Sequence, residues 1–291
     1  MSPALPTTIL GLDFSGGRAA ARHSWLAVGE RWAGGLRVER LFPLAALGAS
    51  SRETAYAALR AQVRACGWCA VGIDASFSLP AALVPERDWT ALLATVCQHD
   101  QTAEEWREDC RRRVPGQELR RQTDRLARTP FSPYNVRAYR QTFFVLRDVL
   151  APLREEGACV LPMDAPRVGR PWVLEVCPAA TLRQAGWRLP YKGRSARATA
   201  GRGTLLAWLQ QNGLQLADPT FGDQALADAA GDALDALIAA VTVALVLAQP
   251  EALQRVAGTE RCEGWVYRPL PGSLSLPLPL RPTEANLLPL D

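Results

Sequence analysis

Two aspartates follow short apolar runs in the N-terminal part of the chain. Asp13 ends the run at residues 7–13, and Asp74 follows the run Cys69–Ile73. If these runs are neighbouring parallel strands, both carboxylates lie at the carboxyl edge of the sheet, where open α/β sheets bind ligands. Carboxylates held together repel each other, and a divalent cation relieves that repulsion. The pair therefore predicts a metal site, whereas either aspartate alone is more typical of a turn or a helix cap.

Further acidic residues lie in apolar segments later in the chain. Glu175 interrupts the apolar run WVLEV. Asp228, Asp232 and Asp235 are spaced by four and three residues, which predicts that they share one face of a helix. Because the residues after Asp235 are apolar, this end of the helix should contact the sheet. We expect Asp235, with Asp232 as a second candidate, to complete the metal site; the alternative is a solvated first turn.

Basic side chains are candidates for binding phosphate. The chain has 33 Lys and Arg residues, and Lys192, in the motif PYKGR, is its one lysine. We expect Lys192 to contact a phosphate or to pair with one of the acids. Arg121, Arg128 and Arg197 are further candidates for binding phosphate oxygens. A solvated surface position is the competing interpretation for each of the four residues.

No nucleophile motif accompanies these residues. Ser15 lacks the glycine pattern of a nucleophile elbow, and His23 and His99 lie near no triad motif. Cys66 and Cys69 form a CxxC pair, but a zinc site needs a second pair, so we expect a structural role. The seven cysteines are irregularly spaced and no secretory signal is recognisable, which predicts free thiols and a cytoplasmic location.

The elements that must position the acids can be predicted from apolar patterning. The first segment contains three strands, joined to a fourth by a helix that runs from Ser51 to about Gly67. A right-handed crossover places the fourth strand parallel to the first and beside it. The expected strands are residues 7–13, 24–28, 36–42 and 69–73.

The rest of the chain alternates helical and strand patterns. An Arg-rich helical insertion is expected at about residues 86–156. Two short strands with a turn between them, two helices and a last strand follow, at residues 157–163, 171–176, 197–209, 225–247 and 263–267. A single domain over residues 1–270 and an irregular Pro- and Leu-rich tail at 271–291 complete this organisation.

Composition fits a soluble globular protein that is 48% hydrophobic and 21% charged. The formal net charge of +4 permits binding to a polyanion without requiring it. The longest apolar stretch, at residues 236–248, is too short to span a bilayer, so no membrane insertion is expected. The sequence gives no indication of the oligomeric state.

Six motifs occur in the order found in a known family: GLDFSGG, GIDASFSLP, LEVCPAATL, YKGRSARATAGRGTLLAWL, DALDALIAAVTVA and EGWVYRP. Over residues 8–269 the sequence resembles the domain-of-unknown-function family 429, which is described as predicted nucleases. The resemblance implies an α/β, ribonuclease H-like fold. Such a fold has a mixed five-stranded sheet, with three antiparallel strands followed by parallel strands, flanked by helices; here it would carry the helical insertion.

The resemblance also implies a chemistry. Asp13, Asp74 and Asp235 would hold two divalent ions, Mg²⁺ or Mn²⁺, and hydrolyse phosphodiester bonds without a side-chain nucleophile. Asp232 would be the second polar residue of the late helix. Glu175 matches an acidic residue that the family usually has, as a ligand or as a neighbour of the ligands. The implied partner is nucleic acid, with DNA or RNA undetermined.

Two other functions are compatible with the sequence. A strand that ends in Asp followed by glycines also occurs in ATP-dependent phosphotransferases of the sugar-kinase and actin-like superfamily. That architecture needs a second such domain and a second phosphate loop, and neither is recognisable here. The other alternative is a catalytically silent nucleic-acid or protein-binding module, against which the retained acids argue.

Overall fold

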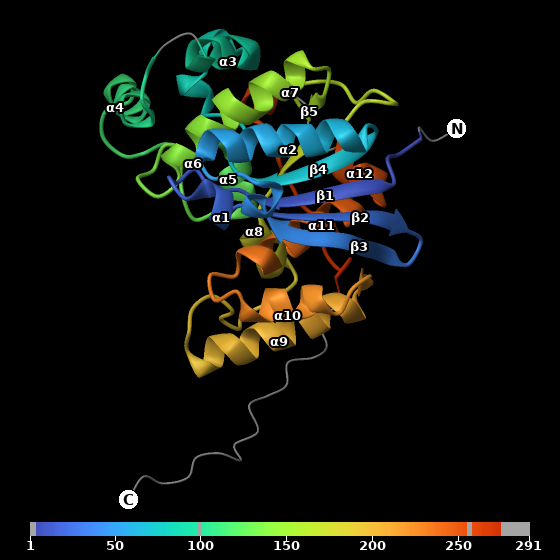
Figure 1. The fold of residues 1–291 in the computed structure, drawn as a ribbon. Coiled ribbons are helices and arrows are strands. Elements are labelled where there is room, and N and C mark those ends of the chain that lie inside the picture. Colours follow the sequence, from blue (N-terminus) through green and yellow to red (C-terminus); the bar gives the residue numbers. More distant parts are fainter. Residues whose placement is uncertain (1–3, 98–99, 255–257, 275–291) are drawn as a thin grey trace, which may run out of the picture.

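A mixed sheet with helices on both faces forms the centre of the protein (Figure 1). The computed structural model describes residues 4–97, 100–254 and 258–274. Its strands follow the order β5-β6-β4-β1-β2-β3-β7, and β8 pairs with β6. Their bounds are Thr8–Asp13 (β1), Trp25–Trp32 (β2), Gly35–Pro43 (β3), Cys69–Asp74 (β4), Cys159–Leu161 (β5), Trp172–Val176 (β6), Leu214–Leu216 (β7) and Val266–Tyr267 (β8).

Helices cover both faces of this sheet (Figure 1). The α-helices are Ala20–His23 (α1), Arg52–Cys66 (α2), Trp89–Cys97 (α3), Ala103–Arg113 (α4), Gln122–Ala127 (α5), Tyr139–Phe144 (α6), Ala151–Glu155 (α7), Pro178–Gln184 (α8), Ala196–Gln211 (α9), Thr220–Ala227 (α10), Asp232–Leu247 (α11) and Pro250–Gln254 (α12). Short turns of other helix types are Leu44–Leu47 (η1), Ala81–Leu83 (η2), Pro85–Arg87 (η3), Val145–Leu150 (η4) and Gly258–Glu263 (η5). None of the described helices is long and apolar enough to cross a bilayer.

The N-terminal part of the fold confirms the predicted crossover. β1, β2 and β3 are antiparallel, and α2 leads to β4, which lies parallel to β1 and beside it. The register places Asp13 opposite Asp74 and Gly11 opposite Gly72. Ser51 caps α2 by accepting a hydrogen bond from the backbone N–H of Thr54. The two aspartates therefore end neighbouring strands, as the sequence predicts.

The sheet is larger than the five strands expected from the resemblance. Among the described residues it has eight, because β5, β7 and β8 extend it on both sides. β5 and β8 correspond to the strands predicted at residues 157–163 and 263–267. β7 was not predicted, because its three residues are too few to show a periodic pattern in the sequence. β7 is parallel to β3, and both β5 and β8 are parallel to β6. Residues 162–171 connect β5 to β6.

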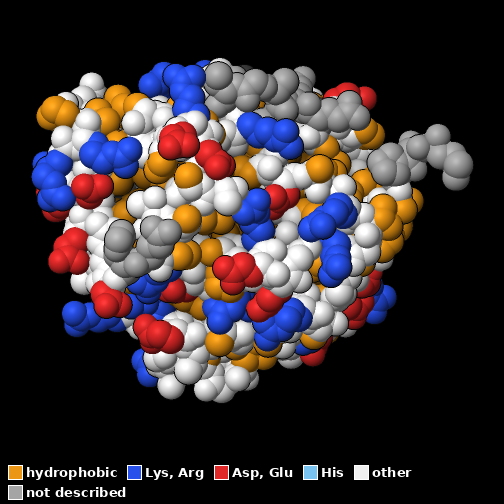
Figure 2. Space-filling view, turned by 90° about the horizontal axis from the view of Figure 1, so that it is seen from above, with side chains coloured by type: hydrophobic (Ala, Val, Ile, Leu, Met, Phe, Trp, Pro, Cys, Tyr) orange, Lys and Arg blue, Asp and Glu red, His pale blue; other side chains and the backbone are white. Residues whose placement is uncertain are grey.

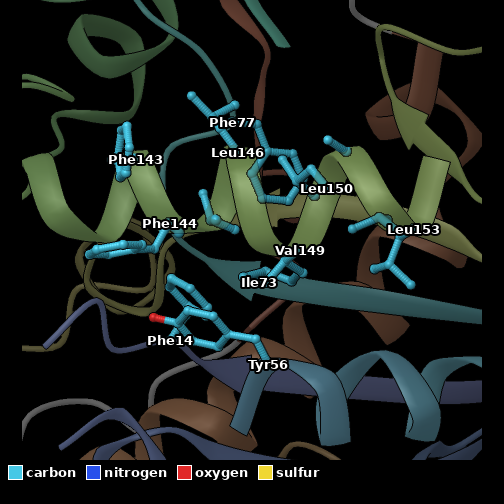
Figure 3. Packing of buried hydrophobic residues seen from close by; sticks show 14 of the residues in the cluster. Phe14, Tyr56, Ile73, Phe77, Phe143, Phe144, Leu146, Val149, Leu150 and Leu153 are labelled. Carbon is cyan, nitrogen blue, oxygen red and sulfur yellow. The ribbon is translucent and has the colours of Figure 1, made fainter. Parts of the chain in front are cut away.

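The insertion packs on the α2 side of the sheet. Within it, α6, η4 and α7 run as one continuous helix whose apolar side chains meet Phe14, Tyr56 and Ile73 (Figure 3). Tyr56 stacks on Phe14 with ring centroids 5.0 Å apart. Pro152 lies within this helix and has no N–H for the carbonyl of Asp148, four residues earlier. Arg60 of α2 donates to that carbonyl instead, and the helix widens to a π-helix over η4.

The late helical region differs from the single helix predicted over residues 225–247. It is divided into α10 and α11, and Gly231 between them has a left-handed φ of 83°. Asp228 lies in this break, where its carboxylate accepts the N–H groups of Ala230 and Ala233 at 3.0 and 2.9 Å. The prediction that Asp228 shares a helical face with the later aspartates is wrong, because its side chain caps α11.

Two glycines allow α11 to lie directly on the sheet. Leu10 and Leu12 of β1 belong to the core under α2, whereas Ile9 belongs to the core under α11. Gly11 shares the α11 face, because strand side chains alternate. A Cβ on Gly11 would lie 2.2 Å from the backbone nitrogen of Ala240. Gly72 occupies the same level on β4, so both acid-bearing strands approach α11 closely.

Gly11→Ala should therefore destabilise the fold. Helix α11 must move away to accommodate the methyl group, at a cost of about 1–3 kcal/mol. Urea unfolding measures this cost. Gly203→Ala in α9 is the matched control, because nothing lies within 4 Å of its added Cβ, and it should be neutral or stabilising by up to about 1 kcal/mol. Equal unfolding midpoints for Gly11→Ala and wild type would contradict the packing argument.

Candidate metal centre

Three aspartates meet where β1, β4 and α11 converge. One carboxylate oxygen from each of Asp13, Asp74 and Asp235 lies within 4.8 Å of the other two. Asp13 and Asp74 are partly buried strand ends, and Asp235 lies in the first turn of α11 with 2% of its surface exposed. The structure thus brings together three of the residues that the sequence nominated as metal ligands.

Burial and mutual repulsion disfavour the ionised form of this cluster. Burial is the main cause that raises the pKa of Asp13, followed by the charges of Asp235 and Asp74. The pKa of Asp74 rises to about 8, mainly through burial and then through Asp235. Burial likewise raises the pKa of Asp235. A cation bound between these carboxylates would remove the repulsion.

The three carboxylates differ in their protein partners. Asp13 and Asp74 accept no side-chain hydrogen bond from any described residue, whereas both oxygens of Asp235 are used. The hydroxyl of Tyr191 donates to Oδ1 of Asp235 at 2.6 Å, and Nζ of Lys192 donates to Oδ2. Burial lowers the pKa of Lys192, but the attraction of Asp235 outweighs it and the net shift is upward. Lys192 therefore carries a positive charge beside the three acids.

A cleft of about 440 Å³ opens onto Asp13 and Asp74. Its walls come from the loop after β1, the start of α6, Lys192 and Asp232. Gln141 of α6 joins the two acid-bearing strands, because its side-chain amide donates to the backbone carbonyls of Phe14 and Asp74. The amide fixes the chain just after each strand, and so fixes the spacing of the aspartates.

Asp232 lies at the wall of the cleft and outside the group of three. It begins α11, and its Oδ2 is 3.2 Å from Nδ1 of His23. Burial raises the pKa of Asp232. The sequence nominated Asp232 as a second candidate ligand and gave no role to His23; the structure pairs the two beside the metal candidates.

Glu175 faces the opposite side of the sheet. Its neighbour in the register is Ile73, one residue before Asp74, so its side chain points toward the insertion. There it accepts hydrogen bonds from the backbone N–H of Phe77 at 3.0 Å and from the guanidinium of Arg121. Burial raises the pKa of Glu175, and Arg121 opposes that shift. Glu175 therefore contacts the loop after Asp74 and not the cluster itself.

Arg121 is buried in this network and has no donor left for a substrate. Its five N–H groups reach Asp124, Glu175 and the carbonyl of Glu263, and 1% of its surface is exposed. This arrangement joins the insertion, β6 and the C-terminal segment. A structural role accounts for these contacts without a phosphate.

Arg128 and Arg197 are exposed and lie away from the cleft. Arg128 ends α5 in a left-handed conformation with φ 54°. Arg197 lies in the first turn of α9. Neither residue lines the cavity beside the aspartates, so among the four basic candidates the structure brings Lys192 alone to the cluster.

Several cleft residues were not recognised in the sequence. Gln141, Arg137 and Arg140 belong to the insertion, whose packing on the sheet could not be read from its helical pattern. Tyr191 had a usable signal, because it precedes Lys192 in a family-matching motif. Tyr191 contacts Asp235 because residues 191–195 lie beside the start of α11. There the backbone N–H of Gly193 donates to the carbonyl of Ala229.

A family model described as "Protein of unknown function (DUF429)" matches residues 11–261. The chain belongs to the DUF429 family. No curated protein and no solved structure matches the chain. The DUF429 region spans all three aspartates, Lys192 and the whole insertion, so the candidate site lies within the part of the chain that the family defines.

The donor set of this DUF429 site can hold a metal ion. Carboxylate oxygens are the ligands that hard divalent cations prefer, and Asp13 and Asp74 have oxygens free of described protein donors. Asp235 supplies the third carboxylate. Three acids opposed by one lysine leave an excess of negative charge in a partly buried place, which a divalent cation would neutralise.

Proposed function

We propose that the protein is a metal-dependent phosphodiesterase of the nuclease class, with Mg²⁺ or Mn²⁺ held by Asp13, Asp74 and Asp235. The observation that carries the proposal is the convergence of three carboxylates within 4.8 Å at a cleft of about 440 Å³. Carboxylate-bound metal ions can hydrolyse phosphodiesters without a side-chain nucleophile, and the ammonium of Lys192 adds a positive charge beside the cluster.

The fold supports this proposal. The strand order β3-β2-β1-β4-β6, with its first three strands antiparallel, agrees with the ribonuclease H-like arrangement that the sequence resemblance implies. The acids also come from the elements expected for that fold, namely the first strand, the fourth strand and a late helix. Fold alone does not define activity, so the chemistry of the site must carry the conclusion.

Bound metal would supply charge neutralisation and activation of a water molecule. The protein's own residues hold the metal-binding carboxylates in position. Gln141 holds the two acid-bearing strand ends together, and Glu175, through the N–H of Phe77, holds the loop after Asp74. Lys192 lines the cleft while bonded to Asp235, where its ammonium can bind a phosphate oxygen. In this proposal Glu175 is a positioning residue.

The direct test is hydrolysis by the purified protein. Single-stranded and duplex DNA and RNA, together with the small diester bis(p-nitrophenyl) phosphate, should be assayed with Mg²⁺, with Mn²⁺ and with EDTA. We expect cleavage that depends on metal and stops in EDTA. Cleavage that persists unchanged in EDTA would contradict the mechanism.

The same preparation separates the alternatives. Calorimetric titration with Mn²⁺ gives the stoichiometry, and two ions per chain would support the two-metal mechanism. Metal binding without turnover on any of these substrates would favour a catalytically silent binding protein. Phosphate transfer from ATP would favour the phosphotransferase.

A further inference from the structure

A second and larger cavity adjoins the cleft. It has a volume of about 800 Å³ and lies between the loop after β1, the start of α2 and the insertion. Its lining includes Arg18, Arg52, Arg140 and Arg147, with Phe143 and Phe144 among its apolar residues. Asp100 and Glu104 are the acids of the lining. Nothing in the proposed hydrolysis uses this cavity.

The lining of the cavity holds four arginines and two acids, which leaves an excess of positive charge. The face of the molecule in Figure 2 mixes basic, acidic and apolar side chains without one large basic area. Arg18, Arg52, Arg140 and Arg147 around one cavity are a concentration of positive charge. A ligand that needs several cations at once would find them here.

Two of the arginines are held together on one aromatic ring. The guanidinium carbon of Arg52 lies 3.6 Å from the ring centroid of Phe144, and that of Arg147 lies 5.3 Å from the same centroid. Two like charges on one ring repel each other. Each has a neighbouring acid, since Arg52 pairs with Glu53 and Arg147 with Asp148. Even with Glu53 as its partner, Arg52 has a buried Nε that makes no hydrogen bond.

The backbone adds to the positive potential. Arg52 lies in the first turn of α2, a helix of 15 residues, where the helix dipole disfavours a cation and favours an anion. Arg147 belongs to the π-helix η4. An anion between Arg52 and Arg147 would relieve both the repulsion and the unfavourable dipole.

Arg140 connects this cavity to the cleft beside the aspartates, because it lines both. It is exposed and pairs with Glu104. Arg18 follows the Gly16–Gly17 turn after β1 and is exposed, and no described residue pairs with it. A chain of phosphates that leaves the aspartates would pass Arg140 and reach Arg18, Arg52 and Arg147.

We propose that this arginine cavity binds phosphates of a nucleic-acid strand whose neighbouring phosphodiester lies at the three aspartates. The inference rests on the proposed function and deepens it, because it assigns a polymeric substrate. Both phenylalanines are buried, so the cavity offers no free ring for base stacking. It recognises backbone charge and not base sequence.

The test is equilibrium binding in EDTA, where metal-dependent hydrolysis does not occur. Fluorescence anisotropy should follow a labelled single strand of about a dozen nucleotides at several salt concentrations. The variants are Arg18→Gln and the double change Arg52→Gln with Arg147→Gln. Arg125→Gln is the matched control, because Arg125 is exposed on α5 and lines neither cavity.

Each lost phosphate contact should reduce the slope of log K against log salt by about 0.7 for a single strand. We expect a reduction of about 0.7 for Arg18→Gln and about 1.4 for the double variant, with no change in Arg125→Gln. Wild-type affinity and slope in Arg18→Gln and in the double variant would overturn the proposal. If thermal melting shows that the double variant is unfolded, Arg18→Gln decides, since its side chain has no described partner to lose.

Failure of this inference can be distinguished from failure of the proposed function. If the protein hydrolyses bis(p-nitrophenyl) phosphate with metal but binds the strand independently of these arginines, the phosphate-binding role of the cavity is overturned. The proposed phosphodiesterase activity is then still supported. Arginine-dependent binding without hydrolysis of any substrate would support the cavity and overturn the phosphodiesterase.

Discussion

Asp13→Asn should make the metal-free protein more resistant to heat and at the same time abolish its response to divalent cations. Asp13 is held among Asp74, Asp235 and Asp232, and burial and these charges raise its pKa. A neutral amide removes that repulsion, which we expect to raise stability by about 0.5–2 kcal/mol in EDTA. Loss of a ligand should weaken metal binding by more than about 100-fold, since even the partners of ligands contribute 10- to 100-fold.

Thermal melting with EDTA and with Mn²⁺ checks both halves of this prediction. Wild type should melt higher when Mn²⁺ is added, because a ligand of the folded state stabilises it, and Asp13→Asn should not. Asp223→Asn is the control, because Asp223 is an exposed acid of α10 outside the cleft. An equal Mn²⁺ response in wild type and Asp13→Asn would exclude Asp13 as a ligand.

The second large effect is a loss of stability with rising pH in the absence of metal. The pKa of folded Asp74 is about 8, against an ordinary value of 3.8. Between these values the folded chain holds a proton that the unfolded chain has released. The contribution to stability is therefore complete below about pH 4 and is lost as the pH rises to about 8. For one carboxyl group the upper limit is roughly 5–6 kcal/mol.

Urea unfolding at pH 5 and pH 8 in EDTA measures this loss. The midpoint should fall at pH 8 for wild type and change much less for Asp74→Asn, which cannot ionise at this position. Saturating Mn²⁺ should oppose the fall, because the metal binds the ionised carboxylates. Identical pH dependence in wild type and Asp74→Asn would show that Asp74 is not the group that titrates.

Much of the candidate site could be predicted because two short motifs obey simple geometry. GLD and GID each end an apolar run, and two antiparallel strands followed by the helix α2 lie between them. A right-handed crossover then leaves one placement for the strands. The prediction that Asp13 and Asp74 are neighbours is confirmed by the register. Asp235 followed from the apolar character of α11, which had to lie on the sheet.

The position of Glu175 could not be predicted, because it depends on register. Side chains alternate along a strand, so a shift of one residue moves Glu175 from one face of the sheet to the other. The sequence places Glu175 near the end of β6 but does not say which residue of β4 lies beside it. The structure pairs it with Ile73, on the face that the insertion covers.

Short-range interruptions were also missed. The pattern of residues 225–247 continues through Gly231, and the break there depends on a left-handed glycine and the capping carboxylate of Asp228. β7 has three residues, and it pairs with the outer edge of β3. Such features are decided by tertiary contacts and not by local pattern.

The hydrogen bonds of Gln141 make the positions of Asp13 and Asp74 depend on the insertion. A chain that lost or exchanged residues 86–156 would also lose the donor that holds the carbonyls of Phe14 and Asp74. Substitutions on the outward surface of this segment should therefore disturb the spacing of the acids less than substitutions in the turn that carries Gln141. An engineer who transplants a new insertion onto this scaffold would need to rebuild that amide first, before altering what the protein recognises.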